Sequence, residues 1–314
     1  MRKHTIFTVF LLAFALVSID GLTQGCSDAG FCTIGALKPL PFSTEKMENK
    51  PRHKVSFLTP IGQGDEAVLV WTPGLQYDYF SKNNLNLQAR VTANYANGNL
   101  GTAFGMGDIY LSASKSRSLR GNWNLTSTIG VKIPLSQSNI SEAGMPLPMQ
   151  YQSSLGTFDV IAGLTFSDKS WQFSAGYQQP LSGENKNGFL PEYWNGKPES
   201  MNYPSTFSFN RKGDVLLRGA RSFSTGNHLS FNAGLLAIYH LGKDEYSNPF
   251  EGNRVMAIDG SQGLTLNLTG AAYWQAGKRT RLGISAGVPL AVREVRPDGL
   301  TRSWVLAPEI SWTF

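Results

Sequence analysis

The sequence predicts a transmembrane antiparallel up-and-down β-barrel of about twelve strands, and three observations support this prediction. Most of the chain alternates apolar and polar side chains with a period of two, which is the pattern of a strand with one apolar face. Only 16% of the 314 residues are charged, whereas a soluble domain averages about 25%. The mean hydropathy is nevertheless slightly negative, at −0.19, which does not fit a bundle of apolar helices. A barrel reconciles these observations because each strand turns an apolar face to lipid and a polar face to the lumen.

The first residues have the features of a targeting segment. Arg2 and Lys3 precede a run of twelve residues, Ile6 to Val17, that is apolar apart from Thr8. This run is shorter than the roughly 20 residues of a spanning helix but fits the core of a signal peptide. We therefore expect residues 1–25 to be a cleaved signal peptide, with a buried helix as the alternative, and residues 52–314 to form the barrel.

Between them, residues 26–51 are expected to form an N-terminal periplasmic segment with a pair of cysteines, Cys26 and Cys32. In an exported protein, a close pair of cysteines favours a small disulfide loop. Lipidation of Cys26 and free thiols remain as alternatives. A metal site is weaker, because two thiolates without a nearby His supply half of a tetrahedral shell.

The alternation marks the barrel strands, of which the last is the clearest. Trp304, Leu306 and Ile310 share one face of this segment, opposite Ser303 and Ala307. Many segments reach ten or more residues, longer than the usual five or six of soluble sheets and long enough to cross a bilayer when tilted. The expected strands lie near 52–60, 66–80, 84–95, 107–116, 122–135, 153–167, 170–180, 212–223, 227–240, 262–275, 279–292 and 301–314.

The connections between these strands give an independent check on their number. With the C-terminus placed in the periplasm, the connections that must face the periplasm are all short: 81–83, 117–121, 168–169, 224–226 and 276–278. Those that must face outward include three long ones: 136–152, 181–211 and 241–261. Short periplasmic turns and long outer loops are typical of outer-membrane barrels, so the alternation supports an even number of strands and an outer-membrane location.

By the same alternation, a set of charged side chains points into the lumen. Unpaired charge in such a space is costly, so these groups should pair across strands or face water. They form either a salt-bridge network that stiffens the barrel or a pore lining that selects solutes by charge. The candidates are Asp78, Arg90, Asp108, Lys132, Asp159, Asp214, Arg218, Arg281 and Glu309.

Two stretches resemble a known family. Gly105-Met106-Gly107-Asp108 and Gly130-Val131-Lys132-Ile133-Pro134 are similar to the Gly-x-Gly-Asp and Gly-x-Lys-x-Pro strands of the outer-membrane transporters grouped with the phenol-degradation meta-pathway proteins. The resemblance implies passive uptake of small solutes, including apolar or aromatic ones. Leu135-Ser136 departs from the family's usual continuation, which leaves the solute open. The final strand, ending at Phe314, resembles the signal by which such barrels engage the barrel-assembly machinery.

One short motif raises the alternative of an enzyme. His228, Ser230 and Asn232 alternate along one strand, a spacing that suits a His–Ser hydrogen bond and a serine nucleophile. The alternation turns this face inward, whereas a lipid-hydrolysing barrel needs its site on the lipid face. We therefore expect a channel rather than an enzyme, and a structural or surface-interaction barrel without transport is the main alternative.

The expected partners are outer-membrane lipid, the assembly machinery and a small solute. The net charge of +6 arises from 28 basic and 22 acidic residues, which are scattered along the chain. Nucleic-acid binding requires clustered basic charge, so no nucleic acid is expected. No motif indicates a cofactor, because Gly105-Met106-Gly107 is followed by neither a helix nor the Lys of a phosphate loop.

Overall fold

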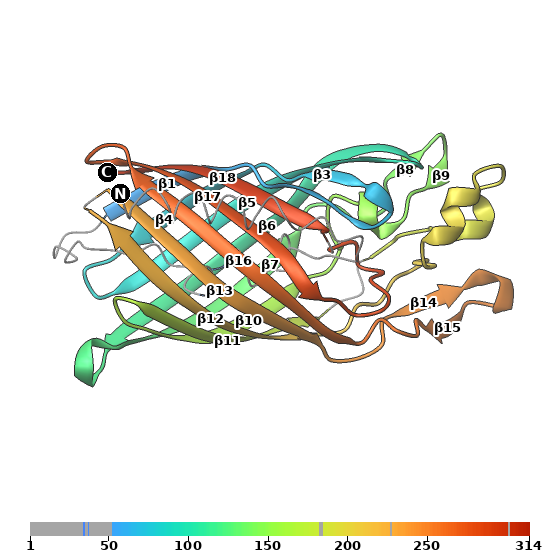
Figure 1. Cartoon of the computed structure of the whole chain (residues 1–314). Coiled ribbons are helices and arrows are strands. Elements are labelled where there is room, and N and C mark those ends of the chain that lie inside the picture. Colours follow the sequence, from blue (N-terminus) through green and yellow to red (C-terminus); the bar gives the residue numbers. More distant parts are fainter. Residues whose placement is uncertain (1–33, 35–36, 38–51, 182–184, 227, 301) are drawn as a thin grey trace.

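The computed structural model describes residues 34, 37, 52–181, 185–226, 228–300 and 302–314, and these form an elongated barrel (Figure 1). Its sheet contains fourteen strands, in which β1 and β2 are the halves of one interrupted wall strand and β3 and β4 the halves of another. Fourteen less two leaves twelve wall strands, each antiparallel to its neighbours, and β1 closes the ring by pairing with β18. The predicted fold class is confirmed.

The wall strands follow the chain in order around the barrel. They are β1 (Arg52–Leu58), β2 (Ile61–Gln63), β3 (Leu69–Trp71), β4 (Gly74–Phe80), β5 (Leu85–Gly98), β6 (Gly101–Ser118), β7 (Asn124–Pro134), β10 (Asp159–Ser167), β11 (Trp171–Pro180), β12 (Asp214–Thr225), β13 (Leu229–His240), β16 (Gly263–Gln275), β17 (Thr280–Ala291) and β18 (Trp304–Thr313).

The remaining elements lie in the connections between wall strands. They are two small hairpins, β8 (Ser141–Glu142) with β9 (Met145–Pro146) and β14 (Glu245–Asn248) with β15 (Arg254–Ala257), and the short 3-10 turns η3 (Asp65–Ala67), η4 (Arg120–Asn122), η5 (Met149–Tyr151), η6 (Pro191–Tyr193), η7 (Pro198–Asn202) and η8 (Pro249–Glu251). Among the described residues, no helix is long and apolar enough to cross a membrane.

Each expected strand corresponds to a wall strand, but β10 begins at Asp159 rather than at the expected 153, and two strands are longer than the sequence indicated. β5 continues to Gly98 and β6 begins at Gly101, beyond the expected boundaries near 95 and 107. The added residues are rich in Gly, Asn and Ala, which weakens the alternation. They pair with each other as a hairpin, from Tyr95 opposite Phe104 to Gly98 opposite Gly101, and therefore satisfy their backbone groups without an apolar stripe.

Prolines explain why two wall strands are interrupted. Proline has no backbone N–H to give to a sheet, and Pro60 separates β1 from β2 as Pro73 separates β3 from β4. Backbone bonds bridge both breaks: the amide of Thr72 donates to the Pro60 carbonyl at 2.8 Å, and the amide of Ala93 donates to the Pro73 carbonyl at 2.9 Å. The ring of strands therefore stays closed across the interruptions.

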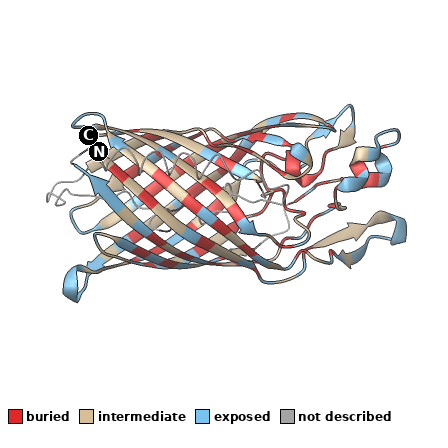
Figure 2. Ribbon diagram, in the orientation of Figure 1, coloured by how far each residue is buried: buried red, intermediate tan, exposed pale blue. Residues whose placement is uncertain are grey.

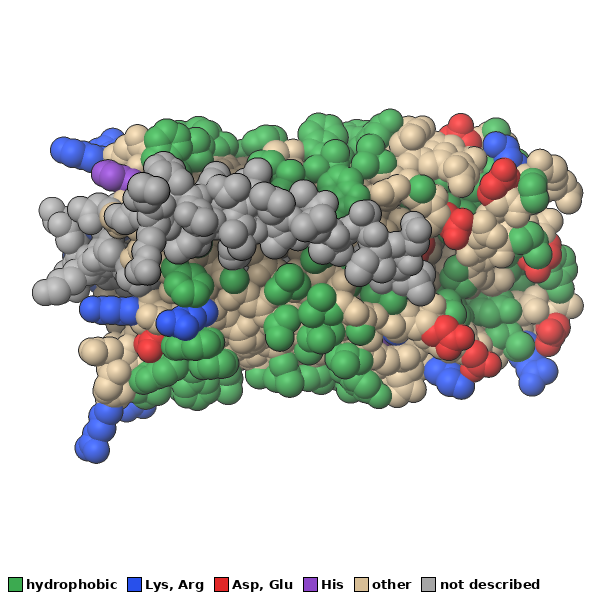
Figure 3. Space-filling view, in the orientation of Figure 1, with side chains coloured by type: hydrophobic (Ala, Val, Ile, Leu, Met, Phe, Trp, Pro, Cys, Tyr) green, Lys and Arg blue, Asp and Glu red, His purple; other side chains and the backbone are tan. Residues whose placement is uncertain are grey.

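The two faces of the wall differ as the alternation predicts. Buried and exposed residues alternate along each strand, which gives the chequered pattern of Figure 2. Large apolar side chains cover the outside, among them Leu268, Ile284 and Leu306, and they form a broad band in Figure 3. Because such a band is stable only against hydrocarbon, the barrel belongs in a membrane.

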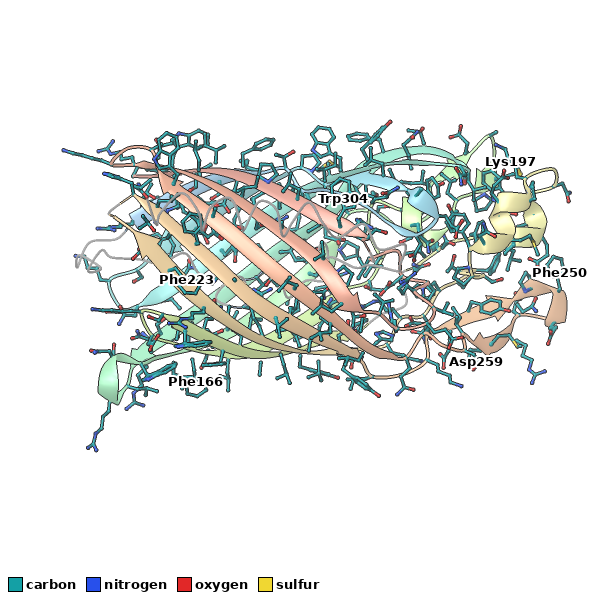
Figure 4. All side chains as sticks on the ribbon, viewed as in Figure 1. Phe166, Lys197, Phe223, Phe250, Asp259 and Trp304 are labelled. Atoms are coloured by element: carbon teal, nitrogen blue, oxygen red, sulfur yellow. The ribbon has the colours of Figure 1, made fainter. Side chains whose placement is uncertain are left out.

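Aromatic side chains mark the border of this band at the end with short turns. Trp171 stacks on Phe173, with ring centroids 5.8 Å apart, and Arg221 lies over the Trp171 ring at 5.3 Å. Phe166 and Phe223 lie toward the same end in Figure 4. Aromatic girdles of this kind are found where barrels meet the lipid headgroups.

The two ends of the barrel have different connections. Phe314 and His53 exchange backbone hydrogen bonds of 2.9 Å at one end, and every connection at this end is short: 81–84, 119–123, 168–170, 226–228 and 276–279. The opposite end carries the long connections 135–158, 181–213, 241–262 and 292–303. The short and long connections are segregated as predicted. Because outer-membrane barrels have short periplasmic turns and long outer loops, we assign the short-turn end to the periplasm and the long-loop end to the outside.

The long connections form packed structure beyond the wall. One apolar cluster joins Leu100 of the β5–β6 hairpin to Leu147, Tyr151, Phe189 and Trp194 of the next two long loops. A second joins Met149, Leu155, Phe209 and Ile258, with Val295 and Leu300 packed against them. Loops from different sides of the rim are thus held to one another over the extracellular end.

Several expectations fall outside the described residues. These are the signal peptide at 1–25, both cysteines, Cys26 and Cys32, and most of the segment 26–51. Two residues of that segment, Ile34 and Leu37, are described, and both are fully buried among inward-facing residues of the barrel wall.

Candidate functional site in the barrel lumen

The inward face of the wall changes in character along the barrel axis. Charged side chains gather at the extracellular end, apolar side chains form a patch below them, and hydroxyl side chains line the wall toward the periplasmic end. Each layer is described in turn, because together they set which solutes the lumen can accommodate.

A buried ion pair lies near the extracellular end of β7 and β10. Lys132 and Asp159 are 1% and 0% exposed, with 3.4 Å between Nζ and Oδ1. The Thr157 hydroxyl accepts from Lys132 at 3.0 Å and donates to Asp159 at 2.6 Å, and the Gln178 amide donates to the other carboxylate oxygen. Because both charges are fully desolvated, these additional hydrogen bonds are what make the pair tolerable.

Asp108 lies beside this pair and is held by two hydroxyls. Ser154 Oγ donates to one carboxylate oxygen at 2.5 Å, and Tyr110 Oη donates to the other at 3.3 Å. Ser154 belongs to the loop after β7, so the contact ties this loop to the inner wall. The structure therefore brings Asp108, Lys132 and Asp159 of the predicted set to one region of the wall, where Tyr110, which bonds to Asp108, lies opposite Lys132 on the next strand.

A larger ionic group, here called the mouth cluster, fixes the long loops to the rim. It consists of Arg211, Asp214, His240, Asp244, Arg293 and Asp298, none of which is more than 7% exposed. Asp298 Oδ2 accepts from Arg293 at 2.6 Å and from Arg211 at 3.1 Å. Burial alone would raise the pKa of the Asp298 carboxyl, but these two guanidinium groups hold it well below its usual range.

His240 extends the mouth cluster to a third loop. Its Nδ1 lies 2.7 Å from Asp214 and its Nε2 lies 2.8 Å from Asp244. Arg211 also pairs with Asp214 at 2.5 Å. The cluster thus joins the ends of β12 and β13 to the loops that follow β11, β13 and β17, and it explains how these loops are anchored.

Below the charges, the inner wall carries an apolar patch. It is formed by Tyr110, Ile161, Leu216 and Leu236, all buried, with Ile238 packed against them. Ile34 and Leu37 are 0% exposed and belong to the same cluster. Arg218 lies next to Leu216 on the same face of β12 and donates from Nη1 to the Leu37 carbonyl at 2.8 Å.

On β6, β7, β10 and β11, the periplasmic half of the wall is lined by hydroxyl side chains that pair between neighbouring strands. Ser114 and Thr128 are 2.9 Å apart, Ser116 and Thr126 are 2.8 Å apart, and Thr165 and Ser174 are 2.9 Å apart. Such pairs satisfy their polar atoms along the wall itself. Their side chains are short, so they leave the axis of the barrel to other groups or to solute.

The other predicted lumen residues occupy separate positions. Lys54 and Asp78 form an ion pair at 3.3 Å on β1 and β4, with Arg90 buried on β5. Arg281 and Glu309 lie half-buried on β17 and β18, and Arg281 Nε donates to Gln275 at 3.2 Å. All these residues share the inward parity that the alternation assigned to them, but they do not converge on one point.

Two groups of lumen residues were absent from the sequence-based set. Arg211, Asp244, Arg293 and Asp298 lie outside the wall strands, where no period assigns a face. Leu216 lies on the same face of its strand as Asp214, and Leu236 on the same face as Asn232. The alternation therefore already indicated that some apolar residues face inward.

The His228, Ser230 and Asn232 motif does not form a nucleophile pair. His228 is exposed and precedes β13, whereas Ser230 is 9% exposed on the inward face. The Asn232 amide donates to Ser222 at 3.1 Å, a contact between wall strands. His228 is therefore a turn residue, and Ser230 and Asn232 are inward-facing residues of the barrel wall.

Comparison with known proteins supports the assignment to outer-membrane barrels at the level of fold. No family model matches the chain, and no curated protein matches its sequence. Among solved structures, it is similar to an outer membrane channel from Pseudomonas putida F1, with a TM-score of 0.56, 13% identity and coverage of 87% of this chain and 100% of that one. The likeness to the NanC porin has a TM-score of 0.45 at 9% identity and covers 83% of this chain and 98% of that one. The likeness to the KdgM porin has a TM-score of 0.44 at 7% identity and covers 83% of this chain and 99% of that one.

The closed wall, the apolar band and the first of these likenesses define the class of this protein. It is an outer-membrane β-barrel with twelve wall strands in the described part of the chain. At 13% identity the likeness extends to the fold, and the resemblance to the meta-pathway transporters stays a prediction.

Proposed function

We propose that this chain is a channel through which small solutes cross the outer membrane. The observation that carries the proposal is the inner face of β6, β7, β10 and β11 in the periplasmic half, where short hydroxyl pairs such as Thr165 with Ser174 replace the large side chains that would fill a core. Hydroxyl groups offer hydrogen bonds to water or solute without fixed charge. The solved structure of the same fold is described as an outer membrane channel, which supports the same conclusion.

We further propose that apolar or aromatic solutes are among those admitted. The inward-facing patch of Ile161, Leu216 and Leu236 supports this, because it offers an apolar solute a contact that a wholly hydroxyl-lined lumen would lack. The patch is contiguous with the polar layers on either side, so a solute with an apolar part could contact it while its polar atoms meet the hydroxyl wall.

The test is solute flux into vesicles that contain the purified full-length protein. We expect small solutes to enter, and Leu37→Gly to increase the rate, because it removes a fully buried side chain from the lumen. The control is Leu37→Ile, which keeps the volume and should leave the rate close to that of the wild type. If no solute enters with any of these proteins, the structural-barrel alternative replaces the channel.

Charge preference gives a second test of the same proposal. Arg281 is half-buried on the inward face, so Arg281→Ala should raise the permeability to cations relative to anions. Arg279 lies exposed in the turn before β17 and is the matched control, since its removal should leave the ratio unchanged. Equal effects at both positions would argue against passage through the lumen.

A further inference from the structure

The apolar patch in the lumen is already filled by two residues of the chain itself, and the way in which one of them is held suggests a ligand. Leu37 is 0% exposed and packs in the cluster formed by Ile161, Leu216 and Leu236. Its backbone carbonyl accepts a hydrogen bond from Arg218 at 2.8 Å. Leu37 thus places its branched hydrocarbon side chain in the apolar patch and its carbonyl oxygen against the guanidinium group of Arg218.

The wall is shaped to leave room for these side chains. A Cβ atom added at Gly163 would lie 2.6 Å from Leu37 Cδ2, and one added at Gly130 would lie 3.1 Å from Ile34 Cδ1. Since real Cβ atoms do not approach other atoms to 2.6 Å, a side chain at Gly163 would force the end of the Leu37 side chain to shift. The two glycines therefore leave the space in the inner wall that Leu37 and Ile34 occupy, here called the hollow.

The charge at this hollow favours an anionic oxygen over a neutral one. Arg218 is 4% exposed on the inward face of β12, where its strand neighbours on that face are Leu216 and Ala220. A guanidinium presents its N–H groups in a planar fork that matches the two oxygens of a carboxylate. A backbone carbonyl has one oxygen and no net charge, so its hydrogen bond to a guanidinium is weaker than that of a carboxylate.

We propose that this hollow is a binding subsite for small carboxylic acids with a branched or aromatic apolar body. The body would occupy the place of the Leu37 side chain, and the carboxylate would bind Arg218 in place of the Leu37 carbonyl. The proposal specifies the class of solute that the channel would carry, and in that respect it rests on the proposed function. Binding itself can be measured without transport.

The experiment compares an acid with its neutral amide. Binding of 4-methylpentanoate and 4-methylpentanamide to the purified, folded, full-length protein is measured by calorimetry. In Leu37→Gly, which vacates the patch, the acid should bind about tenfold more tightly than the amide, a difference of about 1.4 kcal/mol. The wild type should bind the acid more weakly than Leu37→Gly, because the ligand must displace Leu37.

Two further variants identify the group that recognises the carboxylate. Adding Arg218→Gln to Leu37→Gly should bring the ratio of the two affinities to about one, because the cation is lost. Arg218→Lys keeps the charge without the fork and should leave part of the preference, which provides a result if the Gln variant does not fold. Arg221→Gln is the matched control: it lies on the same strand but on the outer face, over Trp171, and should keep the preference.

The outcomes separate this proposal from the channel. Equal binding of acid and amide to Leu37→Gly, or an unchanged preference in Arg218→Gln, would overturn it, as would no binding of either ligand. If solutes pass through vesicles but the acid does not bind, the channel stands and the subsite is wrong. If the acid binds as described and no solute passes, the subsite stands and the channel is wrong.

Discussion

The extracellular mouth and the periplasmic half of the lumen use polar groups in opposite ways. At the mouth, Arg211 and Arg293 converge on Asp298 from separate loops. In the periplasmic half, pairs such as Thr165 with Ser174 bond between adjacent strands. The long ionic side chains at the mouth bridge loop and wall, whereas the hydroxyl pairs of the periplasmic half join adjacent wall strands. The mouth is therefore fixed by its polar groups, and the periplasmic half is lined by them.

The largest effect is expected from breaking the mouth cluster. Asp298→Ala leaves two buried guanidinium groups without the carboxylate between them, and such a loss costs about 3–5 kcal/mol. The free energy of unfolding in urea, measured in lipid vesicles, would show it. Asp259, which is 86% exposed beside Lys243 and lies at the loop end in Figure 4, is the control, because Asp259→Ala removes only a surface pair and should leave stability unchanged.

The comparison of the mouth with the periplasmic half assumes that the residues of both regions face the lumen. A pair of arginine substitutions tests the assignment of inward and outward faces. Ile284 is 43% exposed on the outside, so Ile284→Arg should cost about 2–4 kcal/mol in a lipid bilayer. Ser285, the next residue along β17, faces the other way and should tolerate arginine better. Equal losses of unfolding free energy at the two positions would show that the register differs by one residue.

A smaller effect is expected from the hydroxyl pairs. Thr128→Val keeps the shape of the side chain but removes the hydrogen bond to Ser114, at a cost of about 1 kcal/mol. Changing both partners, as Thr128→Val with Ser114→Ala, should be close to neutral because neither hydroxyl of the pair is then left without the other. The same urea titration measures both. A loss as large as that of Asp298→Ala would remove the distinction between the two regions.

The smallest effect expected is a difference in acid sensitivity. The pKa of Asp298 is lowered in the folded protein, since Arg293 and Arg211 outweigh the effect of burial. Its contribution to stability is therefore present above its ordinary pKa of 3.8 and is lost as the pH falls through the folded value. The urea midpoint of the wild type should decrease on acidification below about pH 4, and that of Asp298→Asn should decrease less. Parallel curves for the two proteins would contradict this assignment.

The period of two determined most of the architecture. Residues along a strand alternate between its faces for geometric reasons, so the inward parity of Lys132 and Asp159 and the outward parity of Ile284 could be read from the sequence. The alternation of short and long connections gave the strand number and the orientation of the barrel. These features follow from local backbone geometry and from the requirement that lipid meets apolar groups.

Tertiary structure alone decided which residues meet. The mouth cluster joins Arg211 to Asp298 across 87 positions of sequence, and no local pattern links two loop residues that far apart. The place of Leu37 in a hollow above Gly163 is likewise set by the curvature of the closed wall, which brings Ile161, Leu216 and Leu236 to one side of the lumen. Alternation along the chain sets the two faces of each strand, and closure of the barrel sets which inward side chains become neighbours.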